Sequence, residues 1–156
     1  MAFHEIQTQW MGKMQFNALV NGHTITMEAP ARVGGEDNGP IPKPFMLTAL
    51  SGCTGMDVVK LLFNKGITLH DFNLNLHGEL SKGQPMEYIS IHVVYEIKGD
   101  AAHKEAAMDA VTTSQEQICG VSSMLKKALP VTWEVLYNGE QLFTNKQEAA
   151  STLVPG

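Results

Sequence analysis

Pro44-Phe-Met-Leu-Thr-Ala-Leu-Ser-Gly-Cys53-Thr-Gly-Met-Asp-Val-Val-Lys60-Leu-Leu-Phe-Asn-Lys65 is the stretch that decides the fold. Pro44 suits the first position of a helix, where no backbone N–H is needed, and Gly66 suits a left-handed cap. The sequence therefore predicts one helix over residues 44–65. Apolar side chains occupy nearly every face of this helix, so we expect other structure to surround it. Its narrow polar stripe consists of Asp57, Lys60 and Asn64.

Short strands are predicted on both sides of the helix. Before it, residues 5–10, 13–20 and 23–28 have strand composition, and Asn21-Gly22 is typical of a hairpin turn. After it, apolar and polar residues alternate over 72–76 and again over 89–97, which indicates an antiparallel pair. Residues 131–137 are predicted as a last strand, followed by a turn at Asn138-Gly139.

Two further helices are predicted between these strands. Asp100 is expected to cap a helix over 101–112. Ser114-Gln-Glu-Gln117 has the spacing of a capping box, which predicts a second helix that ends before Pro130 and carries Cys119 in its first turns. The order of strands, buried helix, strands, helices and strand indicates the α+β class.

Length and composition favour a single domain over residues 1–156, with a core of about 8–137 and a loosely held tail of about 145–156. A net charge of −5, with only Lys126-Lys127 adjacent, argues against a nucleic acid or an anionic membrane as partner. The N-terminus lacks the basic and apolar regions of a signal peptide, and we expect a cytoplasmic protein.

Cys53 and Cys119 are the two cysteines of the chain. In a reducing compartment a permanent disulfide is not expected, so the pair is either transiently bonded or simply buried as small apolar side chains. Cys53 lies too far along its helix for the helix dipole to activate it, so a reactive thiolate there needs a cation. Arg32, the single arginine, is the candidate; it lies in a loop over 29–44 that is rich in proline and glycine.

Other kinds of site find no support in the sequence. The six histidines are scattered and no zinc-binding spacing occurs, so no metal and no cofactor are expected. The Gly-x-Ser-x-Gly elbow of serine hydrolases is also absent from the sequence.

The helix leading to Ser51-Gly52-Cys53, together with the later Cys119-Gly-Val-Ser122, resembles the OsmC/Ohr superfamily of osmotically inducible and organic hydroperoxide resistance proteins. The resemblance covers roughly residues 8–137. It implies an OsmC-like fold in which antiparallel sheets wrap long central helices in an intertwined homodimer. It also implies a peroxidase that uses thiols, without metal or flavin, to reduce organic hydroperoxides in oxidative stress defence. Cys53 would then be the peroxidatic thiolate, Cys119 the resolving cysteine, and a dithiol the reductant.

The resemblance assigns Arg32 to the stabilisation of the Cys53 thiolate. Strongly active members carry a glutamate nine or ten residues before the first cysteine, where this chain has Lys43 and Pro44. Glu36 or Asp37 are candidates for the missing acid, and Lys43 for an additional positive charge. The apolar surroundings of Cys53, with Met56 and Leu50 as pocket residues, favour alkyl hydroperoxides over hydrogen peroxide.

Two alternatives remain open from the sequence. One is a non-catalytic relative, either a redox sensor or a small-ligand-binding dimer, which keeps the fold and the thiols. The other is that both cysteines only fill space in the core.

Overall fold

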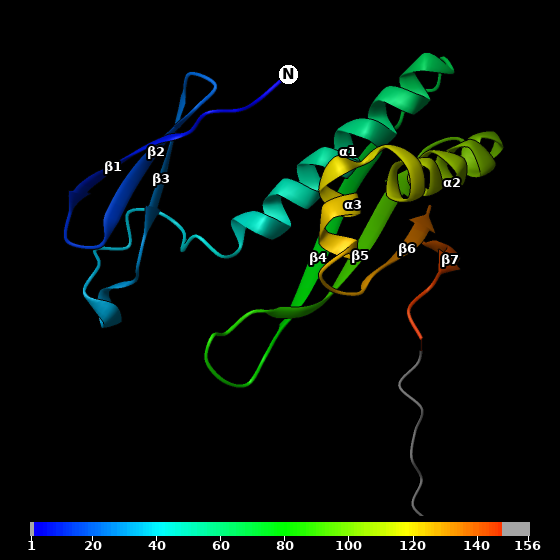
Figure 1. Cartoon of the computed structure of the whole chain (residues 1–156). Coiled ribbons are helices and arrows are strands. Elements are labelled where there is room, and N and C mark those ends of the chain that lie inside the picture. Colours follow the sequence, from blue (N-terminus) through cyan, green and yellow to red (C-terminus); the bar gives the residue numbers. More distant parts are fainter. Residues whose placement is uncertain (1, 148–156) are drawn as a thin grey trace, which may run out of the picture. The chain divides into compact units, whose positions relative to one another are not determined.

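A computed structural model describes residues 2–147 of the chain, which divide into two compact units at Met46/Leu47 (Figure 1). Each unit has its own hydrogen-bonded sheet. The first holds a three-stranded sheet and the loop after it, and the second holds a four-stranded sheet and nearly all of the helical residues that the structure describes.

The N-terminal unit is a meander of β1 (Gln7–Gly12), β2 (Gln15–Val20) and β3 (His23–Glu28). Both pairings are antiparallel, in the order β1-β2-β3. The β2–β3 turn has positive φ at Asn21 and Gly22, which confirms the hairpin predicted from this dipeptide.

The loop over residues 29–44 has more internal structure than its composition indicated. It contains a 3₁₀ turn, η1 (Ala31–Val33), and the carboxylate of Glu28 accepts hydrogen bonds from the backbone N–H groups of Glu36, at 3.0 Å, and Asn38, at 2.9 Å. Glu28 is only 2% exposed. Gly35 packs so closely that a Cβ there would lie 1.6 Å from the carbonyl oxygen of Ala29. The loop therefore has a fixed shape, set by a buried acid that no local sequence pattern distinguishes.

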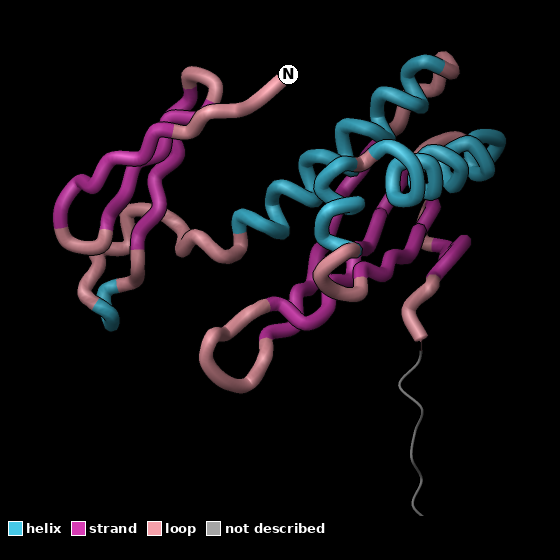
Figure 2. Tube along the Cα trace, in the orientation of Figure 1, coloured by secondary structure: helices cyan, strands magenta, loops and turns pink. Residues whose placement is uncertain are grey.

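The C-terminal unit is built on a sheet with the order β4-β5-β6-β7. The antiparallel pair predicted after the long helix is confirmed as β4 (Asp71–Leu80) and β5 (Tyr88–Lys98), and the last predicted strand as β6 (Val131–Tyr137). Two features were not predicted: β6 runs parallel to β5, and a further strand, β7 (Glu140–Thr144), follows the turn. A parallel pair needs a long crossover, which the helices between β5 and β6 provide (Figure 2).

The long helix is α1 (Phe45–Asn64), which agrees with the predicted span to within one residue at each end. Gly66 has φ of +71°, as a left-handed cap requires. One face of α1 is buried against the sheet, whereas Met56 and Phe63 on another face are 73% and 76% exposed. By length and composition α1 is apolar enough to cross a membrane, a property that core helices share. The fully buried residues of α1 are Leu50, Thr54, Gly55, Val58 and Leu62.

The second helical segment differs from its prediction. Asp100 precedes a 3₁₀ turn, η2 (Ala101–His103), and α2 (Lys104–Thr113) then continues without a break into a π-helical turn, η3 (Ser114–Ile118). Ser114 has helical φ and ψ of −59° and −52°, so the capping box predicted there was wrong. The real break is at Cys119, which caps α3 (Gly120–Lys126) with φ of −71° and ψ of 103°. Ser114 does not cap a helix because its hydroxyl group forms hydrogen bonds with Thr54 and Asp57 instead.

The tail expected to be loose falls mostly on residues 148–156, outside the described part of the chain. At its start, Asn145 is fixed to β6: its side-chain oxygen accepts from the N–H of Trp133 at 2.7 Å, and its own N–H donates to the carbonyl of Trp133 at 3.1 Å.

We predict that Glu28→Ala lowers the free energy of unfolding of the N-terminal unit by about 1–3 kcal/mol, because two backbone N–H groups lose their acceptor. Hydrogen exchange of the amides of Glu36 and Asn38 should accelerate in the variant. Glu36→Ala is the matched control, since it removes an exposed carboxylate of the same loop and should have a clearly smaller effect. Equal protection of both amides in Glu28→Ala and the parent would contradict this account.

Candidate active site: two thiols and a carboxylate

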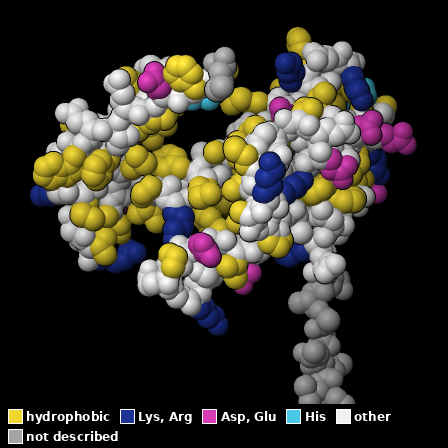
Figure 3. All heavy atoms as spheres, in the orientation of Figure 1, with side chains coloured by type: hydrophobic (Ala, Val, Ile, Leu, Met, Phe, Trp, Pro, Cys, Tyr) yellow, Lys and Arg dark blue, Asp and Glu magenta, His cyan; other side chains and the backbone are white. Residues whose placement is uncertain are grey.

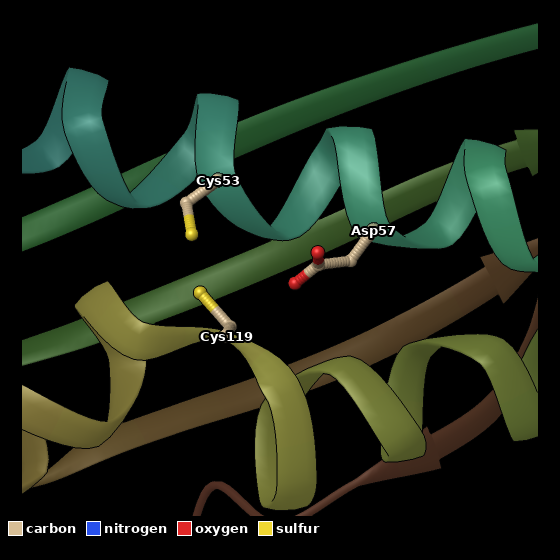
Figure 4. Close-up of side chains that lie close together, drawn as sticks. All are labelled: Cys53, Asp57 and Cys119. Atoms are coloured by element: carbon tan, nitrogen blue, oxygen red, sulfur yellow. The ribbon is translucent and has the colours of Figure 1, made fainter. Parts of the chain in front are cut away.

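The two cysteines, distant in sequence, meet in the C-terminal unit (Figure 4). Cys53 lies in the middle of α1, and Cys119 lies at the junction of η3 and α3. Their sulfur atoms and a carboxylate oxygen of Asp57 all lie within 4.8 Å of one another. Cys53 and Asp57 are half-buried, and Cys119 is 2% exposed. Both sulfurs point into the space between α1 and the Cys119 segment, and the Asp57 carboxylate points into the same space.

The π-turn places Cys119. Its backbone N–H donates to the carbonyl of Ser114, five residues back, at 2.9 Å, and the helix then breaks. The Cys119 Sγ accepts a hydrogen bond from the N–H of Ser122 at 3.4 Å, in the manner of a side-chain N-cap. An α-helical turn with one residue fewer would not bring this sulfur to the same place.

Burial raises the pKa of the Cys119 thiol to about 11. The Ser122 N–H acts in the opposite direction, because it stabilises the thiolate, while the neighbouring Cys53 thiol and the Asp57 carboxylate raise the pKa further. At neutral pH Cys119 is therefore a thiol, and it must lose its proton before it can act as a nucleophile.

A buried chain of hydrogen bonds leads from α3 to Asp57. Ser114 Oγ donates to Asp57 Oδ2 at 3.0 Å and lies 2.8 Å from Thr54 Oγ1, which in turn lies 2.6 Å from Tyr95 Oη. Gln115 Nε2 donates to the same Tyr95 oxygen, and Ser122 Oγ donates to Gln115 Oε1 at 2.7 Å.

The direction of this chain follows from its two ends. An ionised carboxylate only accepts, so the Ser114 hydrogen is committed to Asp57 and Ser114 must accept from Thr54. Thr54 must then accept from Tyr95, whose oxygen accepts from Gln115. Every donor thus points toward Asp57, an arrangement in which successive bonds polarise one another. Burial also raises the pKa of Tyr95 to about 12, which keeps its hydroxyl a donor.

Four other residues singled out from the sequence belong to the N-terminal unit. Arg32 is exposed in η1, and Asp37 and Lys43 also belong to the N-terminal unit. The carboxylate of Glu36, proposed as a substitute acid, is paired with Lys13 at 2.5 Å. The roles of these four residues toward Cys53 stay predictions.

The two predicted pocket residues lie on different faces of α1. Leu50 is fully buried in the core, whereas Met56 lines an open groove of about 770 Å³ along the outer face. Gly52, adjacent to Cys53, belongs to the same groove, and most of the lining is apolar. The space-filling view shows many apolar side chains on the surface of the chain (Figure 3).

Sequence reasoning named Asp57 only as part of the narrow polar stripe of the helix and gave it no place in the site. Its spacing of four residues from Cys53 was a usable signal, because residues i and i+4 share one face of a helix. Ser114, Thr54 and Tyr95 carried no such signal, since their contacts join residues 41–60 positions apart. By spacing alone the two thiols and the carboxylate could also surround a thiophilic cation, although thiol redox chemistry does not require one.

A two-unit α+β chain with a cysteine in the middle of its long helix and a second thiol opposite it defines a class of small dithiol proteins. The family model for "OsmC-like protein" matches residues 35–134, which is more than half of the chain, and the protein belongs to this family.

Individual relatives are distant. Protein YhfA of Escherichia coli K12 is 27% identical over 129 residues, covering 82% of this chain and 93% of YhfA. A hypothetical protein from Aquifex aeolicus VF5 has a similar structure, with a TM-score of 0.72 at 24% identity, covering 88% of this chain and 98% of the other. An organic hydroperoxide resistance protein from Elizabethkingia anophelis superposes with a TM-score of 0.63 at 14% identity, covering 88% and 98% of the two chains. These structures confirm the OsmC-like fold expected from the sequence.

We predict that Tyr95→Phe destabilises the protein by about 1–3 kcal/mol at neutral pH, because Gln115 loses its buried acceptor. The pH dependence should also change. The Tyr95 pKa is raised from 10 to about 12 on folding, so its contribution is complete below pH 10 and is lost as pH rises through 12. Tyr95→Phe should remove about 3 kcal/mol of that alkaline loss.

Urea denaturation at several pH values from 7 to 12 measures both effects. Tyr88→Phe, a half-buried tyrosine of β5, is the matched control. An alkaline slope identical in Tyr95→Phe and the parent would refute the assignment.

Proposed function

We propose that the protein is a thiol-dependent peroxidase that reduces organic hydroperoxides, with Cys53 as the attacking cysteine and Cys119 as the resolving cysteine. One observation carries the proposal: two thiols that are 66 residues apart in sequence have sulfur atoms within 4.8 Å. Family membership and the hydroperoxide-resistance proteins of the same fold support it.

The division of roles follows from accessibility. Cys53 is half-buried and can meet a substrate, whereas Cys119 is almost fully buried and protonated at neutral pH. The Cys53 thiolate attacks the terminal oxygen of the hydroperoxide, which releases an alcohol and leaves a sulfenic acid. Cys119 then displaces the hydroxyl group as water and forms the disulfide, and an external dithiol restores both thiols.

Arg32 is proposed to stabilise the Cys53 thiolate, as the family resemblance implies. Its guanidinium remains charged in any environment, which a thiolate partner requires. Because Glu36 is engaged by Lys13, Asp37 is the more available of the two acids proposed to orient Arg32. Lys43 would supply a second positive charge.

A homodimer in the cytoplasm is part of the same proposal. The outer face of α1 exposes Met56, Val59 and Phe63 beside an apolar groove, and a second copy would cover this surface. Apolar surroundings near Cys53 would also favour alkyl over hydrogen peroxide.

A redox sensor or a small-ligand-binding dimer is the second candidate. The ion pair of Glu36 with Lys13 favours it, since it engages one of the two acids proposed to orient Arg32, and a less well oriented guanidinium would stabilise the thiolate less. Negligible consumption of hydroperoxide, together with reversible disulfide formation, would identify the sensor.

We predict that Cys53→Ser abolishes turnover of cumene hydroperoxide with a dithiol reductant, because the nucleophile is lost. Cys119→Ser should still release about one equivalent of alcohol per chain and accumulate a sulfenic acid that dimedone traps. Alcohol release and the intact mass of the protein measure the two outcomes. Unchanged turnover in Cys53→Ser would overturn the proposed function.

We predict that Phe63→Lys shifts the protein from dimer to monomer, because a charge would enter the apolar surface of α1. Light scattering after size-exclusion chromatography gives the mass directly. Asn64→Lys adds the same charge at the neighbouring exposed position and should leave the mass unchanged. A monomeric parent protein would contradict the proposed dimer.

A further inference from the structure

Asp57 shares the site with both thiols, yet the peroxidase scheme above gives it no task. It follows Cys53 by one helical turn on α1, and its carboxylate lies within 4.8 Å of both sulfurs (Figure 4). Asp57 makes no ion pair with a lysine, arginine or histidine of residues 47–147. A half-buried carboxylate that has no cationic partner in this part of the chain and lies beside two thiols requires an explanation.

The hydrogen-bond chain fixes this carboxylate in place. Ser114 Oγ holds Oδ2 at 3.0 Å, and the donors behind Ser114 all point the same way. No hydrogen bond of the described residues involves Oδ1, which leaves that oxygen for a proton from the site. The chain therefore orients Asp57 rather than neutralising it.

The resolving step is where a base is needed. With a pKa of about 11, only about one Cys119 in ten thousand is a thiolate at pH 7. Cys119 must therefore transfer its proton as it attacks, and the groups around it differ in their ability to accept one.

The remaining groups near Cys119 are poor acceptors. The Ser122 N–H and the Lys126 ammonium are donors, and Lys126 already donates to the carbonyl of Gln115. The Tyr95 hydroxyl is a donor with a pKa of about 12, and Glu116 is exposed and acts on Lys126. Cys53 carries the sulfenic acid at this stage. The Asp57 carboxylate is the acceptor that remains.

We infer that Asp57 is the proton-transfer residue of disulfide formation, a role that rests on the proposed function. As Cys119 Sγ attacks Cys53 Sγ, the S–H proton of Cys119 passes to the Asp57 carboxylate. The S–S bond forms, the S–O bond of the sulfenic acid breaks, and Asp57 gives the proton to the leaving hydroxyl, which departs as water. The two thiols supply the two electrons that the hydroperoxide has taken. Asp57 accepts one proton and gives one away, so it ends the step as a carboxylate.

The first experiment is a single turnover of the reduced full-length protein with one equivalent of cumene hydroperoxide, followed by intact mass with and without dimedone. In Asp57→Asn, which keeps an acceptor for Ser114, Cys53 should oxidise within about threefold of the parent rate, while the disulfide should form about 10²–10⁴-fold more slowly at pH 7. Asp109→Asn, an exposed carboxylate of α2, is the matched control and should behave as the parent.

The pH profile separates proton transfer from a structural defect. In Asp57→Asn the disulfide rate should rise about tenfold per pH unit from 7 toward 10, because hydroxide then generates the Cys119 thiolate directly. The parent rate should change much less over this range, so the two rates converge as pH approaches the Cys119 pKa of about 11. Asp57→Glu, which restores a carboxylate, should recover most of the rate and the flat profile, and it serves as the deciding variant if Asp57→Asn does not fold.

A second arm needs no peroxide. A nitroaromatic disulfide reagent should modify the half-buried Cys53 first and release one equivalent of a coloured thiolate, and attack by Cys119 on the mixed disulfide then releases a second equivalent. Slow, pH-dependent release of the second equivalent in Asp57→Asn supports the inference even if the parent fails to react with cumene hydroperoxide, a result that would overturn only the peroxidase. Equal release rates and equal profiles in Asp57→Asn and the parent would overturn the role of Asp57.

Discussion

The hydrogen bond between Thr54 and Ser114, at 2.8 Å, is the contact on which the site depends. Both side chains are fully buried, and they join the middle of α1 to the start of the π-turn. A buried hydroxyl must find a partner, so each one fixes the position of the other. Cys53 is the residue before Thr54, and the π-turn ends at the residue before Cys119. The distance between the thiols is thus set by two hydroxyl groups that take no part in thiol chemistry.

Burial has opposite consequences for the thiol of Cys119 and for the polar chain beside it. Burial makes Cys119 a weak acid, and the Ser122 N–H offsets only part of that cost. In the adjacent polar chain each side chain from Ser122 to Ser114 has a hydrogen-bond partner, which is the condition under which buried polar groups can stabilise a core. The result is a buried thiol that is inert in isolation beside a carboxylate held in one orientation. Such a pairing suits a step that must wait until Cys53 has been oxidised.

Much of the fold could be predicted from local signals. Pro44 and Gly66 marked the ends of α1, and Asn21-Gly22 marked a hairpin, because each of these effects is contained within one turn of chain. The failures were non-local. The capping-box pattern at Ser114 was real, yet a buried bond to Thr54 outweighed it, and the parallel pairing of β5 with β6 depended on a crossover that no local pattern encodes. The thiols themselves could be named in advance, whereas the carboxylate beside them was noted only as part of a polar stripe.

The position of Cys119 in the site depends on the number of residues in the π-turn over Ser114–Ile118. Substitutions within it can be absorbed by neighbouring side chains, but removing one residue would restore an α-helical turn and rotate everything that follows by roughly a quarter turn or more. Cys119 would then face another direction with its chemistry intact. In the course of evolution this segment should therefore accept changes of residue far more readily than insertions or deletions, and a relative that lacks one residue here would be expected to have abandoned the thiol pair.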